Sequence, residues 1–132
     1  PGELTMIKKQ SGSAHKGMGG KVLVIGGGPY QGAPYLTGLG ALRAGADLVR
    51  VASPVIFQSP DLIYELLPGD RITESHLPRL LDLVTEADVV VCGNGLGAES
   101  DDVTREVIAH CKKAVLDADA LGLPLPEADE SI

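Results

Sequence analysis

The chain has 132 residues, of which 44% are apolar and 22% are charged, and its formal net charge is −7. This length suffices for one domain with a single core, and the composition excludes a disordered chain. The 11 Lys and Arg residues form no concentrated cationic surface of the kind that nucleic acids require, so we expect no nucleic-acid partner. Neither a secretory signal nor an apolar run of membrane-spanning length is apparent, so we expect a cytoplasmic protein without membrane contact.

Segments with the periods of strands and helices alternate along the chain. Residues 21–26 (KVLVIG) form a continuous apolar run, typical of a parallel strand that is buried on both faces. Residues 53–72 are ambiguous, because LIYELL fits a third strand or a short helix. The other predicted segments are helix 33–44, strand 47–52, helix 74–85, strand 88–93, helix 101–110 and strand 114–121. This alternation predicts an α/β fold with a parallel sheet and helices on both faces.

Several single residues have a predicted structural role. Gly38 and Gly40 lower helical propensity, so we expect that face of helix 33–44 to pack closely against another element. Cys92 ends an apolar strand and is interpreted as a buried reduced thiol. His76 and His110 are interpreted as surface residues of helices. No pair of histidines has the spacing of metal ligands, and Cys111 completes no metal site or disulfide framework.

Three unusual loops each follow a predicted strand. They are GGGPYQGA (26–33), GNGLGAES (93–100) and DADAL (117–121). In a parallel sheet the ligand lies outside the carboxyl ends of the strands. We therefore expect the three loops to share one edge of the sheet and to form a binding site there.

The glycine loops fit the standard phosphate patterns unequally. In GGGPYQGA, Ala33 and Pro34 stand where a Walker A loop requires Lys and Ser or Thr, so a P-loop is rejected. Its glycines could instead serve only close packing of the strand and the helix. Gly93, Gly95 and Ala98 do satisfy G-x-G-x-x-G/A, the dinucleotide fingerprint of an NAD-dependent Rossmann enzyme. The acidic residues that follow are poor neighbours for a phosphate.

The DADAL segment brings two carboxylates to the end of the last predicted strand. Asp117 and Asp119 would lie on the same side of an extended segment. They suit a Mg²⁺ site, a ribose hydroxyl or a general base, or simply a helix cap and a solvated acid. His15, followed by Lys16 and Gly17, could contact a ligand or begin the first strand.

Taken together, HKGMGGKVLVIGG, YQGAP, GALRAGADLV, ADVVVCGNGLG and VLDADAL resemble the NAD(P)H-hydrate dehydratase family of the ribokinase-like superfamily. These blocks occur in the family's order from about Ser13 to Leu123. The segment PGELTMIKKQSGSAHKG also resembles the junction in bifunctional members, where an epimerase domain precedes. The resemblance implies that residues 1–14 are a linker and that residues 15–132 are the N-terminal part of a dehydratase (carbohydrate-kinase-like) domain.

The resemblance also implies a metabolite-repair reaction. Such enzymes dehydrate the S-epimer of hydrated NADH or NADPH, with ADP or ATP as the phosphate donor and Mg²⁺, and they commonly form homo-oligomers. By motif position, Ala33 and Gly95 match residues that contact the hydrated cofactor. Asp119 is a further substrate-binding candidate, and Asp117 a weaker one, through a ribose or a water-bound metal. No catalytic residue and no direct metal ligand is expected within this chain.

Two departures from the family pattern bear on this expectation. Asn94 stands where the family's glycine loop usually has Pro. The sequence also stops before the family's Pro-His loop, its nucleotide-binding Lys-Gly segment and its G-T-G-D motif, so we expect the chain alone to be inactive. Two alternatives are a ribokinase-like small-molecule kinase and a non-catalytic Rossmann-type nucleotide-binding module.

Overall fold

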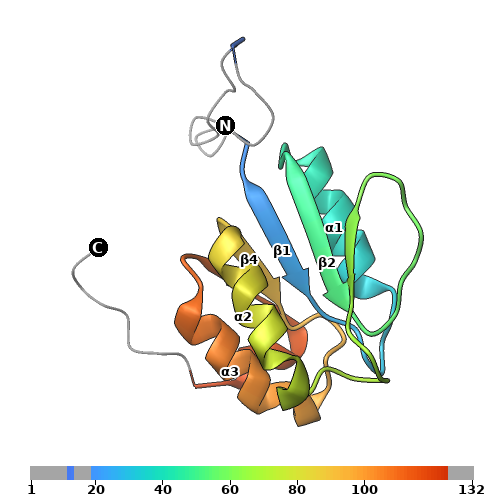
Figure 1. Ribbon diagram of the computed structural model, residues 1–132, viewed down its shortest axis with the longest axis vertical. Coiled ribbons are helices and arrows are strands. Elements are labelled where there is room, and N and C mark those ends of the chain that lie inside the picture. The colour runs from blue at the N-terminus through green and yellow to red at the C-terminus, as the bar shows by residue number, and fades with distance from the viewer. Residues whose placement is uncertain (1–11, 14–18, 125–132) are drawn as a thin grey trace, which may run out of the picture.

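Five parallel strands form one sheet in the order β3-β2-β1-β4-β5 (Figure 1). The structure is a computed structural model that describes residues 12–13 and 19–124. Its strands are β1 Lys21–Ile25, β2 Leu48–Ser53, β3 Ile63–Leu66, β4 Val89–Cys92 and β5 Ala114–Leu116. The helices are α1 Ala33–Arg43, η2 Glu74–His76, α2 Leu77–Glu86, η3 Ala98–Ser100, α3 Asp101–His110 and η4 Ala118–Gly122, where η marks a 3₁₀-helix. The predicted α/β fold with a parallel sheet is confirmed.

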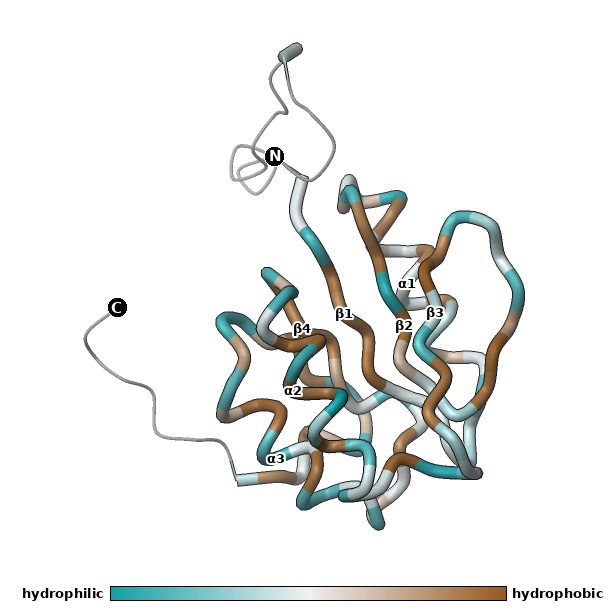
Figure 2. Tube along the Cα trace, viewed as in Figure 1, coloured by the Kyte–Doolittle hydropathy of each residue, from teal (hydrophilic) through white to brown (hydrophobic). Residues whose placement is uncertain are grey.

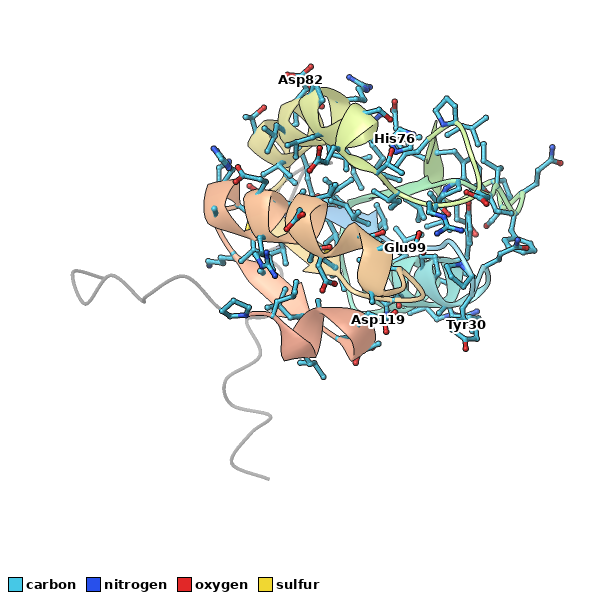
Figure 3. All side chains as sticks on the ribbon, turned by 90° about the horizontal axis from the view of Figure 1, so that it is seen from below. Tyr30, His76, Asp82, Glu99 and Asp119 are labelled. Carbon is cyan, nitrogen blue, oxygen red and sulfur yellow. The ribbon has the colours of Figure 1, made fainter. Side chains whose placement is uncertain are left out.

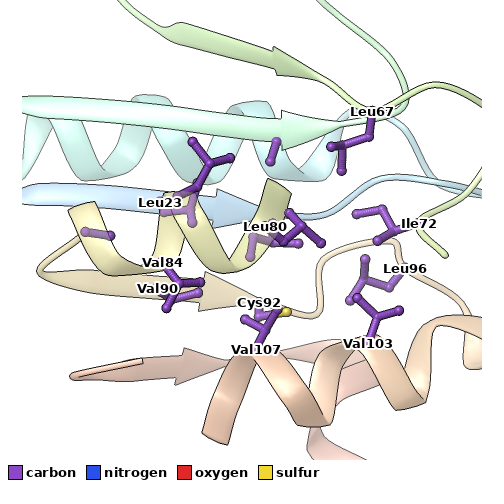
Figure 4. Packing of buried hydrophobic residues seen from close by; sticks show 14 residues of the cluster. Leu23, Leu67, Ile72, Leu80, Val84, Val90, Cys92, Leu96, Val103 and Val107 are labelled. Atoms are coloured by element: carbon purple, nitrogen blue, oxygen red, sulfur yellow. The ribbon is translucent and has the colours of Figure 1, made fainter. Parts of the chain in front are cut away.

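Helices cover both faces of the sheet, as the sequence predicts. In Figure 1, α1 lies on one face, and α2 and α3 lie on the other. Because side chains alternate along a strand, Leu23 and Ile25 of β1 join the cluster under α2 and α3, whereas Val24 joins the cluster under α1. Figure 4 shows the cluster under α2 and α3 from close by, and Figure 2 shows the hydrophobic strands that lie between the two layers of helices. Two apolar clusters therefore hold the three layers together.

The carboxyl ends of the strands stop at one level. Ile25 of β1 pairs with Ala52 of β2 and with Cys92 of β4, and Cys92 also pairs with Leu116 of β5. Each of these residues is the last or the next-to-last of its strand. The loops that follow the strands therefore leave the sheet at the same edge, where parallel α/β proteins bind their ligands.

The ambiguous segment 53–72 contains a strand. The run IYEL has β-branched and aromatic residues, which suit a half-buried pleated surface, and it pairs with β2 as strand β3. The loop before β3 folds over the start of α1. There the rings of Tyr35 and Phe57 pack edge to face with centroids 5.1 Å apart, and the Tyr35 hydroxyl donates a hydrogen bond to the Val55 carbonyl. This contact ties the loop to the α1 side of the sheet.

The two glycines inside α1 differ in their surroundings. A Cβ added at Gly38 would lie 3.1 Å from side-chain atoms of Leu62 and Val51. Glycine at this position therefore lets α1 approach the sheet closely, as predicted. At Gly40 an added Cβ would meet no atom within 4 Å, so the prediction of close packing is wrong there.

The predicted helix 74–85 begins as a 3₁₀ turn and continues as α2. Pro78 lies in the first turn of α2, where its missing N–H removes no intrahelical hydrogen bond. The turn before it is stabilised by a side-chain cap described below. None of the helices in the described part of the chain is long and apolar enough to span a membrane.

Candidate functional site

The three loops singled out in the sequence meet at the carboxyl edge of the sheet. The N–H of Gly27 donates to the Asn94 carbonyl at 2.8 Å, which joins the loop after β1 to the loop after β4. Asn94 Nδ2 donates to Asp117 Oδ2 at 2.9 Å, and the Gly97 N–H donates to Asp119 Oδ2 at 2.9 Å. These bonds join the loop after β4 to the segment after β5. The predicted convergence is confirmed.

Glycine is required where the first two loops touch. Gly95 is buried and has a φ of +71°, and an added Cβ there would overlap the Tyr30 carbonyl. A Cβ at Gly28 would lie 3.2 Å from the carbonyl oxygens of Gly95 and Leu96. These glycines therefore allow backbone to pack on backbone. Their packing role is established, and contact between Gly95 and a substrate stays a prediction.

Ala33 is the first residue of α1 and lies at the same edge. No side chain caps this helix, and its first turn contains no acidic residue. The N–H groups of Tyr35 and Leu36 bond to the Gly32 carbonyl, but no described residue accepts a hydrogen bond from the Ala33 N–H. A donor at the positive end of a helix favours an oxygen atom of a ligand. The position fits the predicted contact of Ala33 with substrate.

The acidic segment after β5 differs from the predicted extended strand. The strand ends at Leu116, and residues 118–122 form the 3₁₀-helix η4 after Ala118 adopts a φ of +47°. The prediction that Asp117 and Asp119 lie on the same side of an extended segment is therefore wrong. Each carboxylate accepts its own hydrogen bond from the glycine loop. The physical reason is that the chain turns at Ala118 and that Asp117 suits the position before a helix. Both carboxylates are exposed, so both are accessible to a ligand.

A fourth segment, residues 67–73 after β3, also reaches the edge, although no pattern in the sequence predicted it. A Cβ at Gly28 would lie 3.8 Å from the Arg71 Cα. Arg71 forms an ion pair with Glu99, and the Ser100 hydroxyl donates to the Ile72 carbonyl at 2.8 Å. Figure 3, seen from below, shows Glu99 on the same face as Tyr30 and Asp119. The positive charge of Arg71 offsets a Glu99 carboxylate that would otherwise repel an anionic ligand.

His76 holds this fourth segment in place, so its predicted surface position is wrong. The side chain is 8% exposed. Its Nε2–H donates to the Pro68 carbonyl at 2.8 Å, and its Nδ1 accepts from the Thr73 N–H at 3.0 Å. The helical period placed His76 on the outer face, but the 3₁₀ turn before α2 directs it inward as a cap. His110 is exposed on α3 as predicted, and His15 lies outside the described residues.

Cys92 lies at the end of β4, directly beneath the site. It is buried, and this burial raises the pKa of its thiol to about 12. A thiol with this pKa stays protonated at neutral pH and is a poor nucleophile. The prediction of a buried reduced cysteine is confirmed, and Cys92 contributes packing rather than chemistry.

Residues 22–128 match the NAD(P)H-hydrate dehydratase family. A bifunctional NAD(P)H-hydrate repair enzyme of Methanospirillum hungatei is 54% identical over 132 residues, which are 100% of this chain and 28% of that protein. The ATP-dependent (S)-NAD(P)H-hydrate dehydratase 2 of Puccinia graminis is 36% identical over 141 residues, covering 94% of this chain and 41% of that protein. The chain thus spans less than half the length of these curated relatives.

Two solved structures share the fold. A ribokinase-like superfamily protein of Enterococcus faecalis superposes with a TM-score of 0.68 and 26% identity, covering 87% of this chain and 42% of that protein. A hypothetical protein of Streptococcus mutans superposes with a TM-score of 0.68 and 28% identity, covering 89% of this chain and 44% of that protein. The fold is therefore ribokinase-like, and the family match spans all four loops at the edge of the sheet. The chain belongs to the NAD(P)H-hydrate dehydratase family.

Proposed function

We propose that the protein carrying this chain dehydrates the S-epimer of hydrated NADH or NADPH and so restores the cofactor, with ADP or ATP as phosphate donor. The observation that carries the proposal is the convergence of the loops after β1, β4 and β5 at one edge, in a chain of this family. The names of the relatives support it, since one specifies ATP and the S form of the hydrate.

The chemistry is a phosphoryl transfer followed by an elimination. The hydroxyl oxygen on the hydrated ring loses its proton to solvent as it bonds to the terminal phosphorus, and the shortened nucleotide leaves. The neighbouring carbon then loses a proton, the C–O bond breaks, phosphate departs and the ring double bond returns. Such reactions depend on positioning and on stabilisation of charge.

The residues of this chain serve the substrate side of the reaction. Ala33 offers a small side chain and an N–H group without a partner among the described residues. One oxygen of Asp119 accepts from the Gly97 N–H, so its other oxygen can accept from a substrate hydroxyl. Gly95 sets the shape of the loop between them. We assign substrate contact to Ala33, Gly95 and Asp119, and we assign no proton transfer to a described residue.

The resemblance implies that the reaction uses Mg²⁺. Within residues 12–13 and 19–124, no group of three or more His, Cys, Asp or Glu side chains could hold a metal ion. We therefore derive no step through a metal. We further propose that residues 1–14 link this domain to an upstream epimerase domain, which the word bifunctional in the names of relatives supports. We also propose that the protein is a cytoplasmic homo-oligomer, as the family resemblance implies.

The test is to incubate the complete protein with the S-epimer of hydrated NADH, Mg²⁺ and either ADP or ATP, and to follow the return of NADH absorbance. We expect turnover that requires one of the two nucleotides. Omission of the nucleotide and use of a hydroxymethylpyrimidine with ATP are the controls. Phosphorylation of the pyrimidine without any recovery of NADH would overturn the proposal in favour of a small-molecule kinase.

A further inference from the structure

Asn94 has a buried oxygen atom that no group in the described part of the chain satisfies. The side chain is 8% exposed, and Asn94 Oδ1 has no hydrogen-bond partner. It is the one buried side-chain nitrogen or oxygen in that state among the described residues. The other buried polar side chains, Ser53, His76, Ser100 and Thr104, all make hydrogen bonds. Buried acceptors are nearly always satisfied, so this atom points to a donor from outside the described residues.

The orientation of the Asn94 carboxamide is fixed by its neighbours. Nδ2 donates to Asp117 Oδ2 at 2.9 Å, and the backbone carbonyl of the same residue accepts from Gly27. A flip of the amide would place Oδ1 against the Asp117 carboxylate, and two acceptors would then face each other. Because Oδ1 and Nδ2 belong to one planar group, a donor on the Oδ1 lone pair that faces Nδ2 also lies near the Asp117 carboxylate.

The carboxamide of Asn94 lies beside the carboxylate of Asp117. Asp117 and Asp119 are exposed, and no Lys or Arg among the described residues forms an ion pair with either of them. A phosphate or carboxylate of a ligand would be repelled here. The Asp117 side chain makes one hydrogen bond to the described residues, the bond from Asn94, so its second carboxylate oxygen can accept a hydrogen bond from a ligand.

We propose that Asn94 and Asp117 bind the vicinal diol of a ribose, with one hydroxyl donating to Asn94 Oδ1 and the other to the Asp117 carboxylate. Two adjacent acceptors require two donors on adjacent atoms, and a diol provides them. This assignment rests on the proposed function in so far as the ribose belongs to a nicotinamide nucleotide. It adds Asn94 as a residue that determines specificity for an unmodified diol.

The experiment measures binding and needs no turnover. Nicotinamide mononucleotide and AMP, each with its 2′-deoxy counterpart, are titrated into the complete protein by calorimetry. We expect at least one of the two ribonucleotides to bind about tenfold more tightly than its deoxy form, because one hydroxyl loses a charge-assisted hydrogen bond. The nucleotide that shows the difference identifies which ribose of the dinucleotide occupies the site.

Variants of Asn94 and Asp117 test whether these two residues cause the difference in affinity between the ribo and deoxy forms. Asn94→Leu keeps the shape of the side chain but removes both polar atoms, and Asp117→Ala removes the carboxylate. Both should bind the ribo and deoxy forms equally. Asn94→Ser serves the same purpose if the Leu variant does not fold. Asp82→Asn, a change at an exposed position of α2 (Figure 3), should keep the tenfold ratio.

Each remaining outcome overturns the inference. These outcomes are no binding of either ribonucleotide by the wild type, equal binding of the ribo and deoxy forms, and a ratio that survives both Asn94→Leu and Asp117→Ala. The dehydration assay is separate. Turnover of hydrated NADH without a diol preference refutes the diol site alone, whereas a diol preference without turnover refutes the proposed function alone.

Discussion

Replacement of His76 by Phe tests how the loop after β3 is held at the site. Phe keeps an aromatic ring of similar size, but it cannot donate to the Pro68 carbonyl or accept from the Thr73 N–H, bonds of 2.8 and 3.0 Å. Pro68 is exposed, so water can replace the lost donor, and the net loss is about 0.5–1.5 kcal/mol. The half-buried Thr73 N–H loses its acceptor at about 1–3 kcal/mol. We expect a local destabilisation of about 1.5–4.5 kcal/mol in total.

The assay is hydrogen exchange at the Thr73 amide in the complete protein. A local loss of about 1.5–4.5 kcal/mol corresponds to exchange that is roughly 10-fold to 2000-fold faster. His110→Phe is the matched control, because His110 is exposed on α3, and it should change stability by less than about 0.5 kcal/mol. An unchanged Thr73 exchange rate in His76→Phe would refute the assignment of His76 as the anchor of this loop.

Three further predictions concern charge, thiols and the substrate. Hydrogen bonding to Arg79 lowers the pKa of Glu65, so the stability from this pair is present above the unfolded pKa and is lost as the pH falls through the folded pKa. Arg79→Ala should weaken this acid dependence, measured by NMR titration of the Glu65 carboxyl group and by unfolding at several pH values. Cys111 should react with iodoacetamide before Cys92, since burial raises the pKa of Cys92 to about 12, as mass spectrometry can show. Ala33→Leu should raise the KM for the hydrated cofactor at least about tenfold, because added bulk displaces the substrate.

Each of these predictions has an outcome that contradicts it. An acid dependence that persists unchanged in Arg79→Ala would show that other groups cause it. Alkylation of Cys92 in the folded protein would show that β4 opens readily. For the substrate, Ala109→Leu on the exposed side of α3 is the control, and an equal KM in both Leu variants would remove Ala33 from the site.

The strands and the meeting of the loops were predictable because they follow from local patterns. Continuous apolar runs such as KVLVI define parallel strands, and parallel strands send their loops to one edge. The sequence also displays the glycines of two of these loops, although it did not predict that Gly28 and Gly95 lie where the loops touch. These features depend on spacing along the chain, which the sequence displays directly.

The features that were not predictable depend on backbone geometry or on contacts between residues that are distant in the sequence. The inward turn of His76 follows from a 3₁₀ start to the helix, which helical periodicity does not reveal. The early end of β5 depends on a positive φ at Ala118, a conformation that no sequence rule expects of alanine. Arg71 was missed because its partner Glu99 is 28 residues further along the chain, and ion pairs at this separation leave no local signal.

The bond between the Gly27 N–H and the Asn94 carbonyl joins two loops of the site through backbone atoms alone. A backbone bond does not depend on the identity of the side chain at position 94. Evolution could therefore exchange that side chain, and with it the group that faces a ligand, while the loops kept their positions. The glycines beside it lack this freedom, because any Cβ at Gly95 would overlap the neighbouring loop. Within one short motif, a position that admits only glycine thus maintains the architecture, while the side chain at position 94 can adjust ligand preference.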